Sequence, residues 1–404
     1  MKKITCILCT MALFLGACGT KIEMEENPSL HVAVWSESYK QDLENLWNEA
    51  YPQQAGALQI DVIEEDGISA LLYEEDTIPY DIYPVKDEEI AMLIDDLLSL
   101  PNKYEDSLEV ASFDHLSNFI NQVNHCYLPL AGNGFLFAYN KTKLDELGLD
   151  SSIIESFEAM IEADVENIFY FYDNTLFTLP LLSSELGFFP GYDSQIVNFE
   201  SDAFRNSYQA FQKIRNGLGL SSDPAHFDNW FIDQAYLSGL IGPWMQSNQS
   251  EDINGIDLVF TQLPSVEGKA LKTEVSTYGY VINSQTQYPN AALLLLQLIH
   301  SKAGMQLLVD DTDEWIPFIP ETMMGEFVIE DENLRGKIYA MNETMANHLI
   351  GLEVNRKVGA IEVFADEQIH SLLEECLDDE DLGVCQQQLS ERAKEWIEEK
   401  RKVE

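Results

Sequence analysis

Aromatic side chains beside turn-forming residues are the part of this sequence best suited to hold a small molecule. Trp244 directly follows Gly-Pro in SGLIGPWMQS (238–247), at the end of a short apolar run. A ring fixed on such a turn can stack on a flat apolar surface of a ligand, or it can fill a core. The same two interpretations are open for Trp35, which ends the run LHVAVW. Trp315, in DEWIPFIP, can rim a binding site or lie on the surface or in a core.

Polar side chains that could accompany these rings follow Trp35 directly. The turn from Glu37 to Lys40 comes after a strand-like run, and open α/β sheets bind ligands at the carboxyl ends of their strands. Acidic runs such as IEEDG and LDDEDLG are expected to be solvated surfaces. Because the chain has 70 acidic residues, adjacent carboxylates occur by chance, and spacing alone identifies no acid–base pair.

The histidines and cysteines predict neither a metal site nor a catalytic site. The seven histidines are scattered, and no HExxH or Gly-x-Ser-x-Gly motif occurs. Cys126 is solitary, whereas Cys376 and Cys385 flank an acidic turn and could staple two helices in an exported protein. We therefore expect no catalytic residue, no metal and no cofactor.

The overall charge excludes several partners. The chain has 404 residues, a net charge of −47 and an apolar fraction of 46%. This length predicts about two domains, and the composition is typical of globular proteins. The excess of carboxylates repels phosphate backbones and anionic head groups, so we expect no nucleic-acid partner and no direct docking on lipid.

The first residues predict an export signal. Two lysines precede an apolar stretch from Ile4 to Leu15, which is too short to span a bilayer. The stretch ends in Leu-Gly-Ala-Cys18, which resembles a bacterial lipobox, where the cysteine is lipidated and begins the mature chain. An ordinary signal with a chance cysteine is the alternative. We expect removal of residues 1–17 and a polar tether at 18–29, of which the part after the cysteine spans at most about 35–40 Å.

From residue 30 onward, strand-like and helical segments alternate. Strands are predicted at 30–35, 58–65, 80–85, 133–140, 167–173, 255–264 and 278–284. Helices are predicted from about Tyr39, around Ile90–Leu97, around Phe204–Ile214, over 228–239, from Pro289 and through the C-terminal region. The alternation predicts an α/β fold, and the lack of one obvious linker suggests that the chain crosses between domains more than once.

Segments along nearly the whole mature chain match one known pattern. They are VAVW, IPYDIYPV, LPLAGNGFLFAYNKTKLDELGL, LFTLPLLSSELGFF, FIDQAYLSGLIGPW followed by GIDLVFTQLPSVEGK, and YGYVINSQTQYPNAALLLLQLIHS. In this order they resemble the extracellular solute-binding proteins of ABC importers, in the class that includes maltose- and maltodextrin-binding proteins. The resemblance implies a two-lobed type II periplasmic-binding-protein fold. Each lobe would be a mostly parallel sheet flanked by helices, with the ligand enclosed in a cleft between the lobes.

The resemblance also implies lobe boundaries and a role. Lobe 1 is expected at 30–134 and 279–332, and lobe 2 at 135–278 and 333–404. The protein would be a lipid-anchored monomer on the outer face of the cytoplasmic membrane. It would capture a carbohydrate, an oligosaccharide in the first instance, by lobe closure and deliver it unchanged to an ABC permease.

Individual residues take expected roles from this resemblance. Trp244 matches the family's Gly-Pro-Trp tryptophan, which stacks on sugar. Asn133 and Asn174 fall where maltodextrin binders carry carboxylates that contact sugar. Tyr278 and Tyr280 begin the strand that returns to lobe 1, and we expect alternation to turn only one of them toward the cleft. The remaining residues of the expected ligand-binding set are Trp35, Glu37, Lys40 and Trp315.

Departures from the family argue against maltodextrin as the ligand. Three positions where maltodextrin binders carry stacking aromatic residues are here Val85, Leu176 and Leu179, so a different or smaller glycan is expected. A polyamine, a polyol or an iron complex on the same fold is an alternative, and the acidic composition would suit a polyamine. A secreted glycan hydrolase and a surface adhesin or sensor are further alternatives. The hydrolase would require a positioned carboxylate pair or nucleophile.

Overall fold

A computed structural model describes most of the chain between Ile22 and Val403. The described residues are 22–64, 68, 71, 78–101, 104, 108, 120, 123–170, 199–219, 230–243, 245, 255–271, 275–311, 315–347 and 382–403. Several residues singled out by the sequence lie outside these ranges, namely Cys18, Asn174, Leu176, Leu179, Trp244 and Cys376.

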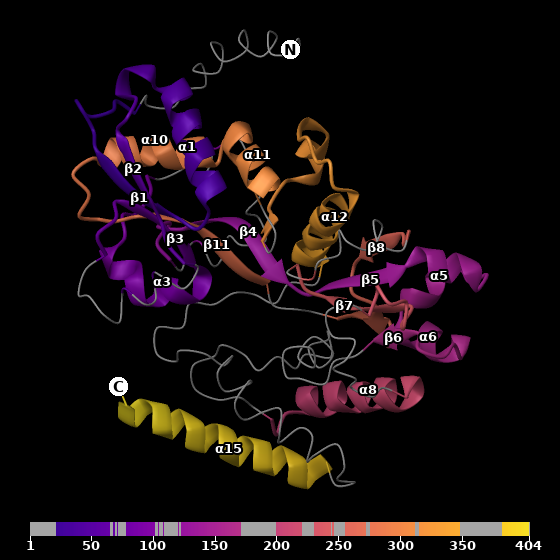
Figure 1. The fold of residues 1–404 in the computed structure, drawn as a ribbon. Helices are drawn as coiled ribbons and strands as arrows, with labels where there is room; N and C mark the ends of the chain where they lie inside the picture. The colour runs from indigo at the N-terminus through magenta and orange to yellow at the C-terminus, as the bar shows by residue number, and fades with distance from the viewer. Residues whose placement is uncertain are drawn as a thin grey trace.

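The larger of the two main sheets contains six strands among the described residues (Figure 1). In spatial order they are β12 (Ile316–Pro317), β4 (Leu128–Gly134), β11 (Val275–Ile282), β3 (Ile82–Lys86), β1 (Leu30–Val34) and β2 (Leu58–Val62). β1 pairs in parallel with β2 and β3, whereas β11 pairs antiparallel with β3 and β4. Strands β1 to β4 therefore run in one direction, as a mostly parallel sheet requires, and β11 and β12 run against them.

A smaller sheet forms the second lobe. Its strands are β6 (Phe169–Tyr170), β7 (Ser238–Ile241), β5 (Leu136–Asn140) and β8 (Leu258–Thr261), with the hairpin β9 (Ser265–Val266) and β10 (Lys269–Ala270) beyond them. Here β6, β7 and β8 share one direction and β5 opposes them. The sequence predicted one strand over 133–140, but Phe135 separates β4 from β5, which belong to different sheets. This passage from the first lobe to the second thus takes place at a single residue.

The chain returns to the larger sheet with β11. This strand pairs with β3 and β4 from Val275 onward, so the larger sheet begins four residues before the expected boundary at 278/279. The lobe boundaries are otherwise a prediction.

Helices cover both faces of the larger sheet. Across both lobes, the helices of the described residues are α1 (Glu37–Ala50), α3 (Asp87–Leu93), α5 (Lys141–Glu146), α6 (Phe157–Ala163), α8 (Asp202–Leu218), α10 (Pro289–Ile299), α11 (Lys302–Asp311), α12 (Glu332–Asn347) and α15 (Leu382–Val403). Short 3₁₀ turns lie at Pro52–Gln54, Ile94–Asp96, Ser151–Ile154 and Glu321–Glu326. α1, α10 and α11 pack on one face, and α3 packs on the other (Figure 1). The face of α1 predicted from periodicity is buried at Tyr39, Leu43, Leu46 and Trp47.

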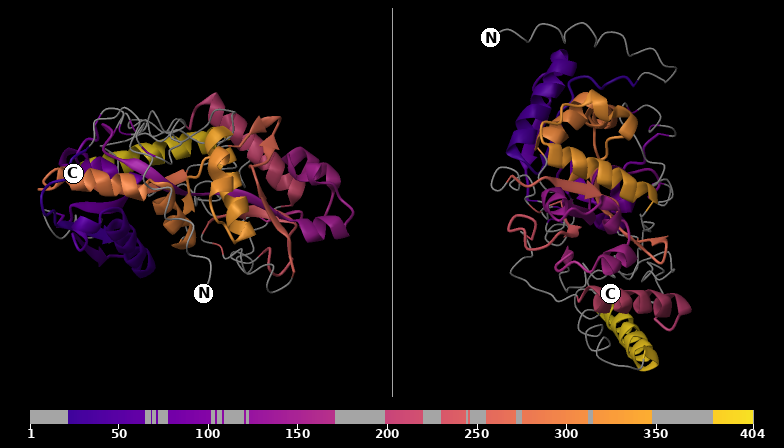
Figure 2. Two further views of the ribbon diagram at one scale, coloured as in Figure 1. Left: turned by 90° about the horizontal axis from the view of Figure 1, so that it is seen from above. Right: turned by 90° about the vertical axis from the view of Figure 1, so that its right-hand side faces the viewer.

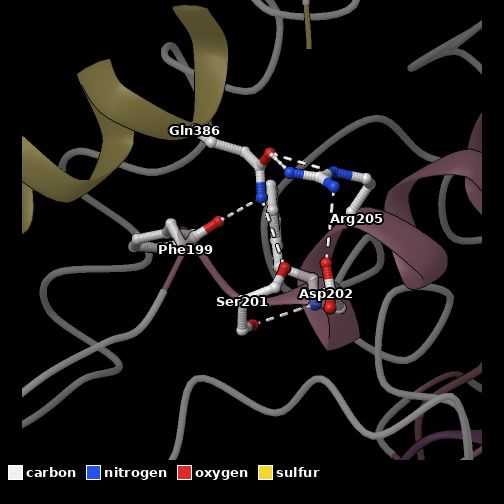
Figure 3. Close-up of polar contacts among 6 residues, drawn as sticks. Phe199, Ser201, Asp202, Arg205 and Gln386 are labelled. Carbon is white, nitrogen blue, oxygen red and sulfur yellow. Dashed lines mark hydrogen bonds and ion pairs between the residues drawn. The ribbon is translucent and has the colours of Figure 1, made fainter. Parts of the chain in front are cut away.

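Helix α8 contains the segment predicted to be helical around Phe204–Ile214. The Ser201 hydroxyl accepts the amide of Phe204 at its start, and Gly219 closes it in the left-handed region at φ +61°. α15 packs alongside α8 at the end of the molecule away from α10 (Figures 1 and 2). In Figure 3, the Gln386 side-chain amide donates to the Phe199 carbonyl over 2.7 Å and accepts from Arg205. Such contacts tie the C-terminal helix to lobe 2.

The helix predicted over 228–239 is wrong for the described part of that segment. Residues 230–234 form turns, residues 235–237 are neither helix nor strand, and β7 begins at Ser238. Gln234 adopts a left-handed backbone at φ +59°, which interrupts a helix, and Leu237 and Ser238 donate to carbonyls of the neighbouring strand segment. Gly239 lies against the buried indole of Trp230, so the Trp230 ring packs on the backbone of β7 at this glycine.

The segment just before β1 is bound to the protein, in contrast to the polar tether expected there. Ile22 and Met24 pack against the core, Pro28 is buried, and Glu25 bonds to the start of α10. Across the described helices, none is by itself long and apolar enough to cross a membrane, and only the bent pair of α10 and α11 reaches that measure jointly.

Candidate functional site

Three of the aromatic residues predicted to bind ligand meet in one cluster. The ring centroid of Trp35 lies 4.6 Å from that of Tyr278 and 6.0 Å from that of Trp315. Tyr278 and Trp315 are 5.1 Å apart, nearly edge to face at 74°. We call these three residues the aromatic cluster.

The cluster lies at the end of the larger sheet where the parallel strands β1 and β3 finish. Trp35 follows the last residue of β1, Tyr278 pairs with Lys86 at the end of β3, and Trp315 precedes β12. β1 and β3 are parallel, so their carboxyl ends meet there, as the rule for ligand sites in open α/β sheets predicts. Tyr278 and Trp315 are 5% and 8% exposed, whereas Trp35 is only half-buried. Trp35 therefore presents the most accessible ring.

The indole of Trp35 offers a hydrogen-bond donor as well as a ring. Its Nε1 is buried, and no acceptor for it exists among the described residues. Buried donors are normally satisfied by protein, water or ligand, so this N–H is an exception among the described residues.

Two serines and an aspartate adjoin the cluster through α1. The hydroxyls of Ser36 and Ser38 both donate to Oδ1 of Asp311, the last residue of α11. Ser36 also caps α1 by accepting the amide of Tyr39. Burial and the charge of Asp311 raise the pKa of Tyr39 well above its ordinary value, so its phenol stays neutral. The sequence did not single out Asp311, because nothing local distinguishes one acidic residue among so many.

Glu37 and Lys40, the predicted polar contacts, lie in the first turn of α1 and face each other. Lys40 Nζ lies 3.7 Å from Glu37 Oε2, and the Glu37 side chain is 77% exposed whereas that of Lys40 is 33% exposed. An exposed pair at this spacing contributes about 0–1 kcal/mol to stability, so little opposes its opening toward a ligand.

Asn133 lies on β4, half-buried and opposite Ser276 of β11. Ser276 and Tyr278 are two residues apart on one strand, so Asn133 and Tyr278 share a face of the sheet. This places Asn133 between the cluster and the passage at Phe135 to the second lobe.

The expectation that only one of Tyr278 and Tyr280 faces the cleft side is wrong in its geometry. Residues two apart on a strand point to the same face, and both rings join the core on the α1 side. Tyr280 is 3% exposed and stacks on Tyr39, with ring centroids 6.4 Å apart, whereas Tyr278 contacts Trp35 and Trp315. The two tyrosines thus have different aromatic partners along one face.

Asp87 links β3 to the return strand and was not predicted. Its Oδ1 accepts the Ser276 hydroxyl and the Thr277 amide, each over 3.0 Å. The Thr277 hydroxyl also bonds to the phenol of Tyr127 at 2.9 Å. Burial, and secondarily the charge of Asp87, raise the pKa of Tyr127 well above its ordinary value. These bonds fix the start of β11, where the chain re-enters the larger sheet.

Lys337 of α12 holds the Gly-Pro turn that precedes Trp244. The ammonium, in a side chain only 8% exposed, donates to the carbonyls of Pro243 over 3.1 Å and Met245 over 3.3 Å. It also lies 5.7 Å from the ring centroid of Phe260. The Met245 amide donates to the Gly242 carbonyl, which closes the turn. Nothing in the sequence around Lys337 could have revealed this long-range contact.

The cysteines and the possible metal-binding side chains are described in part. Cys385 is in a disulfide, and because Cys376 is not described, the pairing of the two stays a prediction. Cys126 is a free, buried thiol. Within the described ranges, no group of histidine, cysteine or carboxylate side chains could hold a metal ion.

Comparison with known proteins decides the family. Residues 50–306 match the family described as bacterial extracellular solute-binding protein. The chain belongs to this family. No curated protein matches this solute-binding protein in sequence.

Solved structures of low sequence identity share its two-lobed fold, as predicted. The cyclic α-maltosyl-1,6-maltose-binding protein of Arthrobacter globiformis is 14% identical with a TM-score of 0.69, covering 92% of this chain and 99% of its own. The extracellular solute-binding protein of Staphylococcus aureus, solved with maltose, is 15% identical with a TM-score of 0.69, covering 93% and 99%. The ligand-free maltodextrin-binding protein of L. casei BL23 is 13% identical with a TM-score of 0.66, also covering 93% and 99%. The family and these neighbours are binding proteins.

Proposed function

We propose that this solute-binding protein captures a carbohydrate between its lobes and delivers it to an ABC permease. The observation that carries the proposal is the meeting of Trp35, Tyr278 and Trp315 at the carboxyl ends of β1 and β3. Aromatic faces suit the apolar C–H faces of sugar rings.

Polar groups around the cluster extend this set. Asn133 can both donate to and accept from hydroxyls, and Glu37 and Lys40 can open toward them. From the second lobe we assign Trp244 as a stacking ring and Asn174 as a polar contact, on the family resemblance. Contacts from both lobes would stabilise the closed state that the permease recognises.

The ligand in this proposal is a glycan other than an ordinary maltodextrin. The similar structures named above are of proteins that bind maltose, maltodextrin or a cyclic maltosyl sugar, which favours a carbohydrate. Val85, however, is fully buried in β3 and pairs with Gly279, so no aromatic ring is offered at that position. The proposal includes removal of residues 1–17, lipidation at Cys18 and action as a monomer at the outer face of the cytoplasmic membrane.

A ligand screen tests the proposal. The chain starting at Gly19 is titrated by calorimetry with a panel of mono- and oligosaccharides and polyamines, and products are analysed by chromatography. We expect one class of glycan to bind with a Kd of about 1 μM, or about −8 kcal/mol, and to be recovered unchanged. Binding of polyamines alone would overturn the carbohydrate assignment, and release of a cleaved product would overturn the assignment as a binding protein.

A further inference from the structure

A carboxylate from the N-terminal segment caps a helix that lies far away in the sequence. Oε1 of Glu25 accepts the amide of Asn290 and Oε2 accepts the amide of Ala291, both over 2.9 Å. These amides belong to the first turn of α10, whose own cap residue, Tyr288, makes no side-chain capping bond. A carboxylate at this end of a helix satisfies two orphan N–H groups and is favoured by the helix dipole.

Further contacts extend this attachment along the whole segment. The Asn290 side chain donates to the Glu23 carbonyl over 2.9 Å. Ile22 and Met24 pack against the core of lobe 1, and the Leu30 amide then bonds to Ala57 as β1 begins. Polar and apolar contacts therefore fix residues 22–29, which we call the N-terminal strap.

We infer that the N-terminal strap stays docked and makes the start of α10 the side of the protein that faces the membrane. The lipid anchor would hold this side of the protein next to the bilayer. The inference therefore rests on the proposed lipidation of Cys18. Only Gly19, Thr20 and Lys21 lie between the lipidated residue and Ile22. Fully extended, the link from Cys18 to Ile22 reaches about 14 Å, far less than the about 35–40 Å available to a free tether.

This short link restricts how the protein can sit. The start of α10 must stay close to the head groups, while α8 and α15 lie at the opposite end of the molecule (Figures 1 and 2). The attached protein can tilt about the link but cannot turn α15 toward the bilayer without undocking the strap.

Hydrogen–deuterium exchange tests docking without any lipid. Glu25→Ala removes both acceptors, and Glu26→Ala is the matched control because Glu26 is an exposed neighbour. We expect slow exchange at Asn290, Ala291 and the strap, accelerated at least tenfold by Glu25→Ala and unchanged by Glu26→Ala. Fast exchange in the unaltered protein, or no response to Glu25→Ala, would overturn the docked strap.

Energy transfer to the bilayer tests the orientation. Dyes are placed at Gln287→Cys, beside the start of α10, or at Gln209→Cys on α8, both exposed positions, in lipidated protein on vesicles with an acceptor on the head groups. We expect stronger transfer from position 287 than from 209, with the difference reduced by Glu25→Ala and kept by Glu26→Ala. Equal transfer from both positions would overturn the membrane-facing surface. Absence of lipid on Cys18 by mass spectrometry would refute the anchoring, whereas the exchange result would still decide the docking.

Discussion

The indole of Trp35 packs on the phenol ring of Tyr278, with centroids 4.6 Å apart and ring planes tilted by 44°. Trp35 directly follows the first strand of the larger sheet, and Tyr278 lies on the strand by which the chain returns from the second lobe. This aromatic contact therefore joins two regions. One is the carboxyl end of β1, where we expect the ligand, and the other is the strand that connects the lobes. We expect a ligand that touches Trp35 to act through this contact on the segment that connects the lobes.

Replacing Trp35 with alanine should weaken ligand binding more than a substitution in the buried core does. The half-buried ring is the accessible member of the cluster, and loss of such an anchor reduces affinity by about 1–3 kcal/mol, or roughly 5- to 150-fold. Calorimetry with the glycan identified in the screen gives the affinity. Trp47→Phe is the control, because Trp47 is fully buried and donates to the Gln54 carbonyl away from the cluster. Equal affinity losses in the two variants would contradict the role of Trp35.

Local patterns predicted much of the architecture that positions these rings. The run before Trp35 forms β1, the apolar face of α1 is buried, and α8 ends at Gly219 with positive φ. In each case a local pattern of hydrophobic residues acts over a few neighbouring positions. Three of the expected ligand residues, Trp35, Tyr278 and Trp315, consequently meet in the structure.

The remaining features depend on contacts that no local pattern contains. The segment at 228–239 has apolar spacing that suits a helix, but pairing with two neighbouring strands makes its end β7. Asp87 and Lys337 act on backbone atoms far away in the sequence, and an acidic chain hides one functional carboxylate among many. Polar composition predicts a tether before β1, but it says nothing about a distant helix whose first turn needs a cap, which Glu25 supplies.

Asp87→Asn should loosen the junction at which β11 begins. The carboxylate accepts both the Ser276 hydroxyl and the Thr277 amide, and the neutral amide is a weaker acceptor for each. We expect a loss of about 1–3 kcal/mol in the free energy of unfolding, measured by urea denaturation. The exposed Asp95 is a suitable control at Asp95→Asn. An unchanged unfolding midpoint for Asp87→Asn would show that these bonds do not stabilise the junction.

Cys126 should be inert in the folded protein. Burial raises the pKa of its thiol to about 12, so the reactive thiolate is scarce at neutral pH, and the side chain is 2% exposed. We expect negligible alkylation by iodoacetamide at pH 7 under native conditions and rapid alkylation in guanidinium chloride. Peptide mass spectrometry measures both rates. Native alkylation as fast as that of a small-molecule thiol would contradict the burial.

His300 should make the fold sensitive to acid. Burial lowers the pKa of its imidazole from 6.5 to about 3, so between these values the unfolded chain binds a proton that the folded chain does not. Stability therefore falls as pH falls through this window, by up to about 1.4 kcal/mol per pH unit. The difference in unfolding free energy between the unaltered protein and His300→Phe isolates this contribution from the carboxylates. A difference independent of pH from 7 to 4 would refute it.

Lys337→Met should act on ligand affinity through the turn that precedes Trp244. The change keeps most of the buried stem but removes the ammonium that donates to the carbonyls of Pro243 and Met245. Without these bonds the turn is less ordered, and we expect affinity to fall about tenfold, equivalent to about 1.4 kcal/mol. Lys337→Arg, which keeps a buried cation and donors, should lose less.

A double-mutant cycle separates this effect from general destabilisation. If Lys337 acts through the ring that the turn carries, Lys337→Met should cost little additional affinity in a Trp244→Ala background. Calorimetry supplies the four affinities, and thermal unfolding shows which variants remain folded at the temperature of the titration. If the loss of binding free energy in the double variant equals the sum of the losses in the two single variants, Lys337 and Trp244 act independently. Two residues that act through one turn would instead give a smaller loss than this sum.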